Sequence, residues 1–207
     1  LQQEIYEMQK GEEVYLTGLE LLMVMLAGVS LPRPEYNKMM KDLIAALKAN
    51  GPRIKPKVRL LYTGGHADNP EFFELLQQND AHVVSDNTGF GTRAADVLIC
   101  EDGDPLEAII NYYFEEKPAA TRQMGTQVER MERLLDLVKQ YKADGVVASR
   151  LYMCDLWAFE HFLMRKRLHE NNVPFLELEV DYTPEGQGQI KTRVQAFVES
   201  LADRQTA

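Results

Sequence analysis

Cys154 is the residue whose type and position most clearly suggest chemistry. It stands between the apolar run "GVVAS" and a helix-like run that begins at Asp155. Asp155 can cap that helix, and a cysteine beside the positive end of a helix dipole favours the thiolate form. A thiolate ligates iron or attacks an electrophile. Cys154 is therefore a candidate metal ligand or nucleophile, and its alternative role is that of an ordinary core cysteine.

A second group of candidates follows the apolar run "VRLLYTG". Gly64 and Gly65 would let the backbone approach a ligand closely. His66 could contact a substrate carbonyl or phosphate, although a surface loop histidine is the commoner case. Arg93 and Arg150 could meet phosphate groups, because the guanidinium fork matches phosphate oxygens. Solvated or ion-paired arginines are the alternative for both.

Alternating apolar and amphipathic runs must position these residues. Short apolar runs predict strands near 57–63, 81–85, 145–149 and 174–180. Helix-like runs lie between them, with start signals at Asn69, Asp104 and Thr126. Strands separated by helices predict a flavodoxin-like α/β domain, with three layers and a parallel sheet. In that arrangement the first and third strands are adjacent, and ligands bind beyond their carboxyl ends.

A helical lead precedes the predicted sheet. We expect residues 1–52 to form helices, with one under way at Leu1 and another capped by Thr17, which pack on the domain or link it to a missing N-terminal part. We expect residues 53–207 to form the α/β domain. The stretch "LLMVMLAGV" is apolar enough to predict a dimer or a larger complex. The start at Leu1, without an initiator Met, suggests a fragment or a processed product.

Composition narrows the class of protein. The 207 residues carry a formal net charge of −9 and are 45% hydrophobic, as in a soluble acidic globular protein. This charge makes nucleic acid an improbable partner. The most apolar stretch, residues 19–31, contains Glu20 and is too short to span a membrane. Two cysteines do not form a secreted disulfide framework, so we expect a cytoplasmic protein.

Several stretches in order resemble one enzyme family. They are "RLLYTGGHADNPEFFELLQQNDAHVVSDNTGFGTR", "EDGDPLEAIINYYF", "ADGVVASRLYMCDLW" and "VPFLELEVDYTPEGQGQIKTRVQAFVESL". The chain resembles the C-terminal part of a subunit of the 2-hydroxyacyl-CoA dehydratase and benzoyl-CoA reductase family, of the 2-hydroxyglutaryl-CoA dehydratase D-component type. The resemblance covers nearly all of residues 14–202.

The resemblance implies a mechanism and its partners. Such subunits pair with a homologous second subunit, carry a [4Fe-4S] cluster on cysteines and bind an acyl-CoA. They receive an electron from a separate ATP-dependent iron–sulfur activator. The electron reduces the thioester carbonyl to a ketyl radical anion, which permits dehydration or ring reduction in an anaerobic radical reaction. Cys154 matches the C-terminal cluster cysteine of the family.

One departure from the family pattern affects the cluster. Where a second cysteine is common, the sequence reads "DNTGFGTR", with Gly89 at the cysteine position, while Asp86, Gly91 and Arg93 are kept. Because a cluster usually needs three or four thiolates, we expect it to be absent or poorly occupied in this chain. We also expect the Cys154 sulfur to lie beside the crevice between "GGHADN" and "NTGFGTR".

Three alternatives to a cluster-bearing enzyme subunit remain open. The chain could be a cluster-less paralogue with a structural or partner-binding role, which Gly89 favours. It could be a cysteine-nucleophile enzyme with His66 or His161 as base. It could also be a plain flavodoxin-like ligand-binding module. Cys100 is expected to be a small buried hydrophobic residue, and Trp157, Phe159 and Phe162 are expected to pack in the core.

Overall fold

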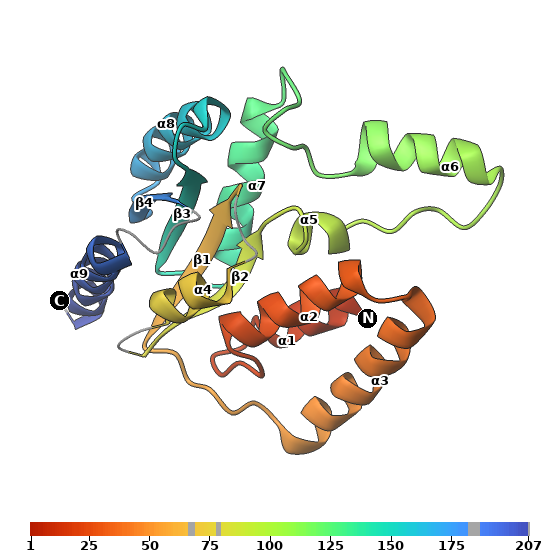
Figure 1. The fold of residues 1–207 in the computed structure, drawn as a ribbon, viewed down its shortest axis with the longest axis horizontal. Helices are drawn as coiled ribbons and strands as arrows, with labels where there is room; N and C mark the ends of the chain where they lie inside the picture. Colours follow the sequence, from red (N-terminus) through yellow and green to blue (C-terminus); the bar gives the residue numbers. More distant parts are fainter. Residues whose placement is uncertain (66–68, 78–79, 182–186, 207) are drawn as a thin grey trace.

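Four parallel strands form the centre of the molecule. The computed structural model describes residues 1–65, 69–77, 80–181 and 187–206 (Figure 1). The strands are β1 (Val58–Gly64), β2 (Ala81–Asn87), β3 (Gly145–Leu151) and β4 (Phe175–Val180). They lie in the order β2-β1-β3-β4, and each neighbouring pair is parallel. The prediction of a parallel sheet with the first and third strands adjacent is confirmed.

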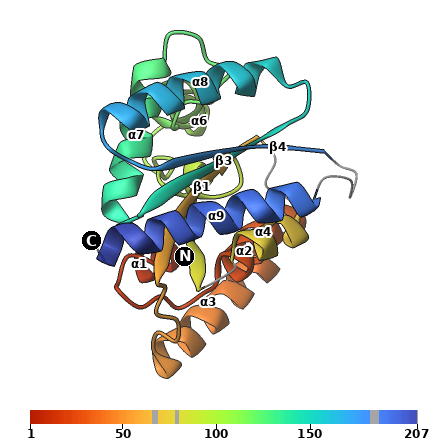
Figure 2. The ribbon, with the colours of Figure 1, turned by 90° about the vertical axis from the view of Figure 1, so that its left-hand side faces the viewer.

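Helices cover both faces of this sheet, as predicted for a three-layer α/β fold. The helices after β1 are α4 (Pro70–Leu76), α5 (Thr92–Ala95), α6 (Pro105–Asn111), the π-helical turn η1 (Tyr112–Glu116), α7 (Gln127–Gln140), α8 (Asp155–Glu170) and α9 (Gln187–Thr206). Figure 2 shows α7 and α8 on one face of the sheet and α4 and α9 on the other. The arrangement is consistent with a flavodoxin-like fold.

The central strand is buried because both of its faces are covered. All seven residues of β1 are buried. Leu61 packs with side chains of α7 and α8, whereas Leu60 and Tyr62 pack with side chains of α4 and α9. A strand buried on both faces has a continuous apolar sequence, which explains the run "VRLLY".

Three helices precede β1 and share its core. They are α1 (Gln2–Met8), α2 (Gly18–Ser30) and α3 (Arg33–Asn50). The predicted cap at Thr17 is confirmed, since Thr17 and Glu20 form a reciprocal capping box at the start of α2. Ile5 of α1 belongs to the same buried cluster as Leu61 of β1. The lead therefore packs against the sheet-forming part, while a domain boundary at 52/53 stays an expectation.

A buried arginine joins the lead to the sheet. Arg59 of β1 donates to the carbonyl oxygen of Gln9 at 3.0 Å and to that of Tyr141 at 2.9 Å. The Gln9 side chain is itself buried and donates to the carbonyl of Leu16 at 2.8 Å. These bonds satisfy polar groups that burial would otherwise leave unpaired, at a cost of about 1–3 kcal/mol each. They fix α1 against the sheet.

The apolar stretch of α2 is only partly covered by the rest of the chain. Leu21, Leu22 and Met25 are buried, whereas Met23 and Val29 remain 52% and 59% exposed. No helix within the described ranges is long and apolar enough to cross a membrane.

An arm formed by α6 and η1 extends away from the body of the molecule (Figure 1). Asp104 caps α6 as predicted, because its Oδ1 accepts from the backbone N–H groups of Leu106 and Glu107 at 2.8 and 3.0 Å. Much of the apolar surface on this part of the chain is open to solvent. The exposed large apolar side chains here are Leu98, Ile99, Leu106, Ile109, Ile110, Tyr113, Phe114 and Met124.

Candidate functional site

The carboxyl ends of β1, β2 and β3 meet at one edge of the sheet. Because the three strands are parallel neighbours, the segments that follow them lie side by side at this edge. Gly65 follows β1, Gly89 lies in the loop after β2, and Cys154 follows β3. This edge is the usual ligand site of a doubly wound sheet. The position of the Cys154 sulfur relative to the crevice stays a prediction.

Cys154 occupies the N-cap position of α8. Its backbone N–H donates to Leu151 at 3.1 Å, and its carbonyl accepts from Ala158 at 2.9 Å. The side chain is half-buried. The prediction that Asp155 caps this helix is wrong, because α8 begins one residue earlier and Asp155 is its first helical residue. Met153, with φ of 62°, makes the left-handed turn that ends β3 and starts the helix.

The two glycines at the carboxyl end of β1 are required by close contacts within the chain. A Cβ atom on Gly64 would lie 2.5 Å from the carbonyl oxygen of Ser149, and one on Gly65 would lie 2.3 Å from Nε1 of Trp157. Trp157 is partly buried against the core, as predicted. The same prediction is wrong for Phe159 and Phe162 of α8, which are 60% and 57% exposed. The predicted ligand-binding role of both glycines stays a prediction, and His66 lies outside the described residues.

The loop after β2 is held by the buried carboxylate of Asp86. Asp86 accepts from the hydroxyl of Tyr6 at 2.5 Å and from the backbone N–H and hydroxyl of Thr88 at 2.8 and 2.7 Å. Burial raises the pKa of Asp86, and the hydrogen bonds from Tyr6 and Thr88 oppose that shift. A Cβ atom on Gly91 would lie 1.9 Å from Asp86 Oδ1, so this position requires glycine.

Gly89 differs from Gly91 in its surroundings. Apart from Gly89 itself and its two chain neighbours, no atom of the described residues lies within 4 Å of a Cβ atom built on Gly89. The backbone thus has room for a side chain at the position where the resemblance expects a cysteine. The absence of a thiol at this point is a property of the sequence and does not result from crowding.

Three arginines lie near this loop, and two of them have partners. Arg130 forms a bidentate salt bridge with Glu160, in which Nε and Nη2 donate to Oε1 and Oε2 at 2.8 and 2.7 Å. Both side chains are almost fully buried. Arg133 pairs with Asp96 at 2.5 Å and donates to Asn87 at 3.2 Å. The contact between Arg130 and Glu160 joins α7 to α8. No sequence signal pointed to it, because its members are thirty positions apart.

Arg93 is the third arginine, and its Nε is buried without a hydrogen-bond partner among the described residues. Burial, reinforced by the positive charges of Arg133 and Arg130, lowers the pKa of Arg93. A partly buried guanidinium with an unused donor is suited to an anionic or carbonyl group of a ligand. The binding role of Arg93 expected from the sequence stays a prediction.

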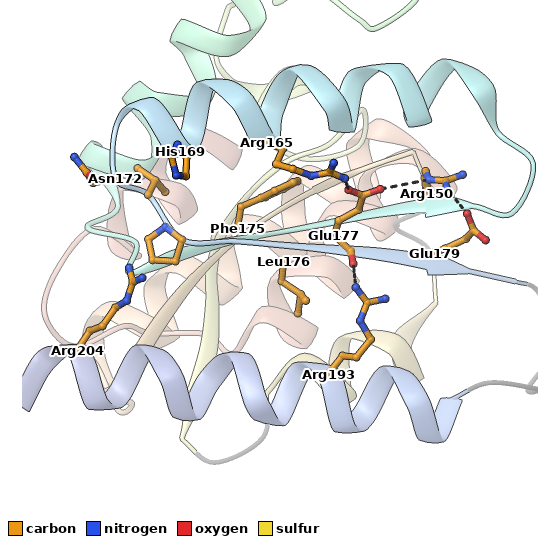
Figure 3. Close-up of a pocket in the computed structure, with 12 residues that line it drawn as sticks. Arg150, Arg165, His169, Asn172, Phe175, Leu176, Glu177, Glu179, Arg193 and Arg204 are labelled. Atoms are coloured by element: carbon orange, nitrogen blue, oxygen red, sulfur yellow. Dashed lines mark hydrogen bonds and ion pairs between the residues drawn. The ribbon is translucent and has the colours of Figure 1, made fainter.

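Arg150 is engaged in ion pairs within the sheet. It contacts Glu179, and its Nε lies 3.8 Å from Glu177 Oε1 (Figure 3). Both glutamates belong to β4. A phosphate would have to compete with these carboxylates for the guanidinium. The phosphate-binding role of Arg150 thus stays a prediction, and the structure shows Arg150 in ion pairs with Glu177 and Glu179.

The prediction that Cys100 is buried is wrong. Cys100 is exposed, in the extended segment between α5 and α6, and its sulfur lies 3.7 Å from the carbonyl oxygen of Asp102. Its neighbours Leu98 and Ile99 are 71% and 40% exposed. The apolar run "DVLIC" therefore lies on the surface, where nothing in the described part of the chain covers it.

His161 is not placed to act as a base for Cys154. It is fully buried, with its ring edge-on to Trp157 and Phe175. It lies seven residues along α8 from Cys154, which is about 10 Å of helix rise. Burial lowers the pKa of His161, and the carboxylate of Glu177, 3.5 Å from its Nδ1, opposes this. The arrangement favours a neutral histidine with a structural role.

Thr126 stands at the N-cap of α7, as predicted, but its side chain does not cap the helix. Its hydroxyl donates to the carbonyl of Gln123 at 2.8 Å and accepts from Nη1 of Arg130 at 2.6 Å. The hydroxyl thereby helps to hold the arginine that pairs with Glu160.

The described residues do not by themselves fit an iron–sulfur cluster. Within them, no group of three or more His, Cys, Asp or Glu side chains is arranged to hold a metal ion. A [4Fe-4S] cluster is typically held by four cysteine thiolates. At this edge the described chain offers the thiol of Cys154, with Gly89 at the position of a second.

Comparison with known proteins decides the family. The sequence matches the family of the 2-hydroxyglutaryl-CoA dehydratase D-component over residues 1–201. The chain belongs to this family. It is 24% identical over 182 residues to the (R)-phenyllactyl-CoA dehydratase beta subunit of Clostridium sporogenes, covering 86% of this chain. It is 22% identical over 204 residues, 97% of this chain, to one of the benzoyl-CoA reductase subunits of Thauera aromatica.

The chain spans about half the length of the relatives that it matches. It covers 47% of the phenyllactyl-CoA dehydratase subunit and 53% of the benzoyl-CoA reductase subunit. With the putative dehydratase subunit YjiM of Escherichia coli (strain K12) it is 29% identical over 156 residues, which is 73% of this chain and 39% of that protein. The membership expected from the sequence is confirmed.

Proposed function

We propose that this chain is part of a subunit of an anaerobic 2-hydroxyacyl-CoA dehydratase or benzoyl-CoA reductase-type enzyme, and that its carboxyl sheet edge faces the acyl-CoA. The observation that carries the proposal is the position of Cys154 at the N-terminus of α8, on a family-matched sheet edge. Arg93, with its unused donor at the loop after β2, supplies the group that binds an anionic or carbonyl oxygen.

Exposed apolar side chains follow β3 around Cys154. Tyr152 and Met153 are 63% and 76% exposed, and Leu156, on the first turn of α8, is 41% exposed. Single exposed apolar residues are ordinary, but a contiguous group beside a binding edge is typical of a surface that meets a ligand or another protein. This group would line the entrance used by the acyl-CoA or contact a second subunit.

The cluster is proposed for the complete enzyme and not for this chain alone. Since the described residues do not fit a complete cluster, no electron-transfer step is assigned to them. Cys154 would supply one thiolate to a cluster whose other ligands lie elsewhere. The second candidate, a cluster-less subunit that binds substrate and partner, is favoured by Gly89, where space for a cysteine exists but no thiol does.

The partners proposed for the enzyme follow from the family. The relatives are themselves named as subunits of a dehydratase and of a reductase, so a homologous second subunit is the first expected partner. The ATP-dependent iron–sulfur activator is the second. Two free cysteines agree with a reducing compartment, and we propose a cytoplasmic location.

Trp157 and Cys154 together provide a direct test of acyl-CoA binding. Trp157 is the one tryptophan of the sequence and lies against Gly65 at the proposed edge. We expect an acyl-CoA to change its fluorescence and to slow alkylation of Cys154 in a Cys100→Ser background. Arg93→Gln should weaken binding about tenfold, the loss of one charge-assisted hydrogen bond. An unchanged rate of Cys154 alkylation at saturating acyl-CoA would contradict the proposed site.

Iron and acid-labile sulfide in the anaerobically purified complete protein separate the two candidates. If Cys154 is a ligand, the Cys154→Ala protein should lose the iron–sulfur chromophore and keep its secondary structure. A wild-type complex that binds acyl-CoA and partner without iron supports the cluster-less subunit. A chromophore that survives in the Cys154→Ala protein contradicts the ligand role of this residue.

A further inference from the structure

Strand β4 is an edge of the sheet, and one side of its backbone faces outward. The sheet order ends at β4 in the described part of the chain. The amide of Val146 in β3 donates to the carbonyl of Pro174 just before β4, and the amide of Tyr152 just after β3 donates to the carbonyl of Val180, both at 2.9 Å. In a parallel ladder with this register, the even-numbered residues of β4 bond to β3. The N–H and C=O groups of residues 175, 177 and 179 therefore point away from the sheet.

One observed bond confirms this direction. The carbonyl oxygen of Glu177 accepts from Nη2 of Arg193, a residue of α9, at 2.7 Å. The remaining outward groups of Phe175, Glu177 and Glu179 have no backbone partner in the described ranges. An edge strand with free N–H and C=O groups is a template for another strand.

A groove of about 760 Å³ runs along this edge, between α8 on one side and α9 on the other (Figure 3). Arg165 of α8 and Arg193 of α9 enter it from opposite sides. The ionisable side chains that line it are Arg150, Arg165, His169, Glu177, Glu179, Arg193 and Arg204. Arginines outnumber carboxylates in the groove, whereas the whole chain has a net charge of −9.

The arginines of the groove that have no carboxylate partner among the described residues lie on α9. Arg150 and Arg165 already pair with the glutamates of β4. Arg193 contacts a backbone carbonyl, and no ion pair with a carboxylate of the described residues is seen for it or for Arg204. Eleven positions apart, the two lie on nearly the same face of α9, separated by about 16 Å of helix rise. Residues i and i+4 of an extended strand are about 13 Å apart on one face, within reach of both arginines.

From this geometry we infer that the groove binds an extended acidic segment of a partner polypeptide, which adds to β4 as a fifth strand. The outward amides of Phe175, Glu177 and Glu179 supply the ladder. Arg193 and Arg204 bind acidic side chains four positions apart on the α9 side of the incoming strand. This inference does not depend on acyl-CoA binding at the carboxyl edge.

The outward N–H and C=O groups of β4 favour a strand over a small anion as the occupant of the groove. A phosphate could bind one of the arginines, but it would leave the outward carbonyl of Glu179 and the amides along the strand unpaired. A strand satisfies them, as in other complexes formed by strand addition. Its acidic side chains complement the guanidinium groups of Arg193 and Arg204, which have no carboxylate partner among the described residues, and its apolar side chains on the other face would meet Phe175 on the α8 side of the groove (Figure 3).

A synthetic peptide tests the inference with the chain as it stands. The probe is acetyl-Thr-Glu-Val-Thr-Val-Glu-Thr-amide, with glutamates at the second and sixth positions, and the matched control has lysine at both. We expect the acidic peptide to slow amide hydrogen exchange at residues 175, 177 and 179, measured by NMR. Arg193→Gln with Arg204→Gln should weaken binding about tenfold, the worth of two exposed ion pairs.

Matched controls keep each outcome decisive. Arg122→Gln, in an exposed segment remote in sequence from the groove, should leave the affinity unchanged. The inference is overturned if the lysine peptide binds equally well or if neither peptide binds. It is also overturned if inorganic pyrophosphate binds through the same arginines while the acidic peptide does not protect the amides. If the β4 amides become protected when the protein concentration rises without any peptide, the inference is also overturned, because a second copy of this chain then binds the edge of β4.

Discussion

At the scale of single residues, Gly89 and Gly91 have different reasons for being glycine. Gly91 packs against the buried carboxylate of Asp86, which is held by Tyr6 and Thr88. Gly89 faces open space. The sequence pattern places both in one motif, but only coordinates separate the glycine that packing requires from the glycine that replaces a functional side chain.

Alanine substitutions should separate the two positions. Gly91→Ala places a methyl group where the Asp86 carboxylate lies, and we expect a loss of about 1–3 kcal/mol in the free energy of unfolding. Gly89→Ala should change it by less than about 0.5 kcal/mol. Urea unfolding followed by circular dichroism measures both. Equal losses would show that the loop after β2 rearranges around either side chain.

The buried pair of Arg130 and Glu160 gives a second prediction at this scale. Glu160→Gln leaves the Arg130 guanidinium buried without a counter-charge, so we expect a loss of about 3–5 kcal/mol. The matched control is Glu132→Gln, which removes the partner of the exposed Arg167 and should cost at most about 1 kcal/mol. Similar losses of stability in both variants, measured by thermal unfolding, would contradict the importance of the buried pair.

At the scale of secondary-structure elements, the sequence predicts most of what is observed. The four strands, their parallel order and the start of α6 at Asp104 follow from apolar runs and capping residues. The start of α8 is missed by one residue, because the left-handed conformation of Met153 is not readable from its side chain. The predicted burial of Cys100 is wrong because an apolar run alone does not distinguish a buried strand from an uncovered segment.

The environments of the candidate site residues follow from the sequence less fully than the elements do. The edge that brings Gly65, Gly89 and Cys154 together follows from the strand order, and so was predictable. The unused donor of Arg93 and the ion pairs of Arg150 were not, since they depend on which side chains meet across elements far apart in the chain.

His161 of α8 should make the free energy of unfolding depend on pH. Burial holds the pKa of His161 below its ordinary value, so its neutral form stabilises the fold above the unfolded pKa of about 6.5. That contribution is lost as the pH falls through the lower, folded pKa, because the unfolded state then binds more protons. We expect wild type to lose more stability than His161→Phe between pH 7 and 5. Parallel pH profiles of the unfolding midpoint would contradict this.

At the scale of the whole molecule, apolar surface is concentrated on the projecting arm. Leu106 and Phe114 of the arm are 66% and 78% exposed, and Figure 1 shows the arm standing clear of the sheet. Acidic residues accompany this surface: Glu101, Asp102, Asp104, Glu107, Glu115 and Glu116. Large apolar patches bounded by polar residues mark protein interaction sites. The arm is thus the surface by which we expect a second subunit to bind.

Polar substitutions on the arm should therefore weaken assembly without weakening the fold. Leu106→Gln with Phe114→Gln removes exposed side chains, so the free energy of unfolding should change by less than about 0.5 kcal/mol. Association of the complete protein with the homologous second subunit that we propose as its partner, measured by sedimentation velocity, should weaken at least about tenfold if these residues are central contacts. Met39→Gln, at a residue of α3 that is 57% exposed, is the matched control. An unchanged affinity in the arm variant, or an equal loss in the control, would place the subunit interface elsewhere on the molecule.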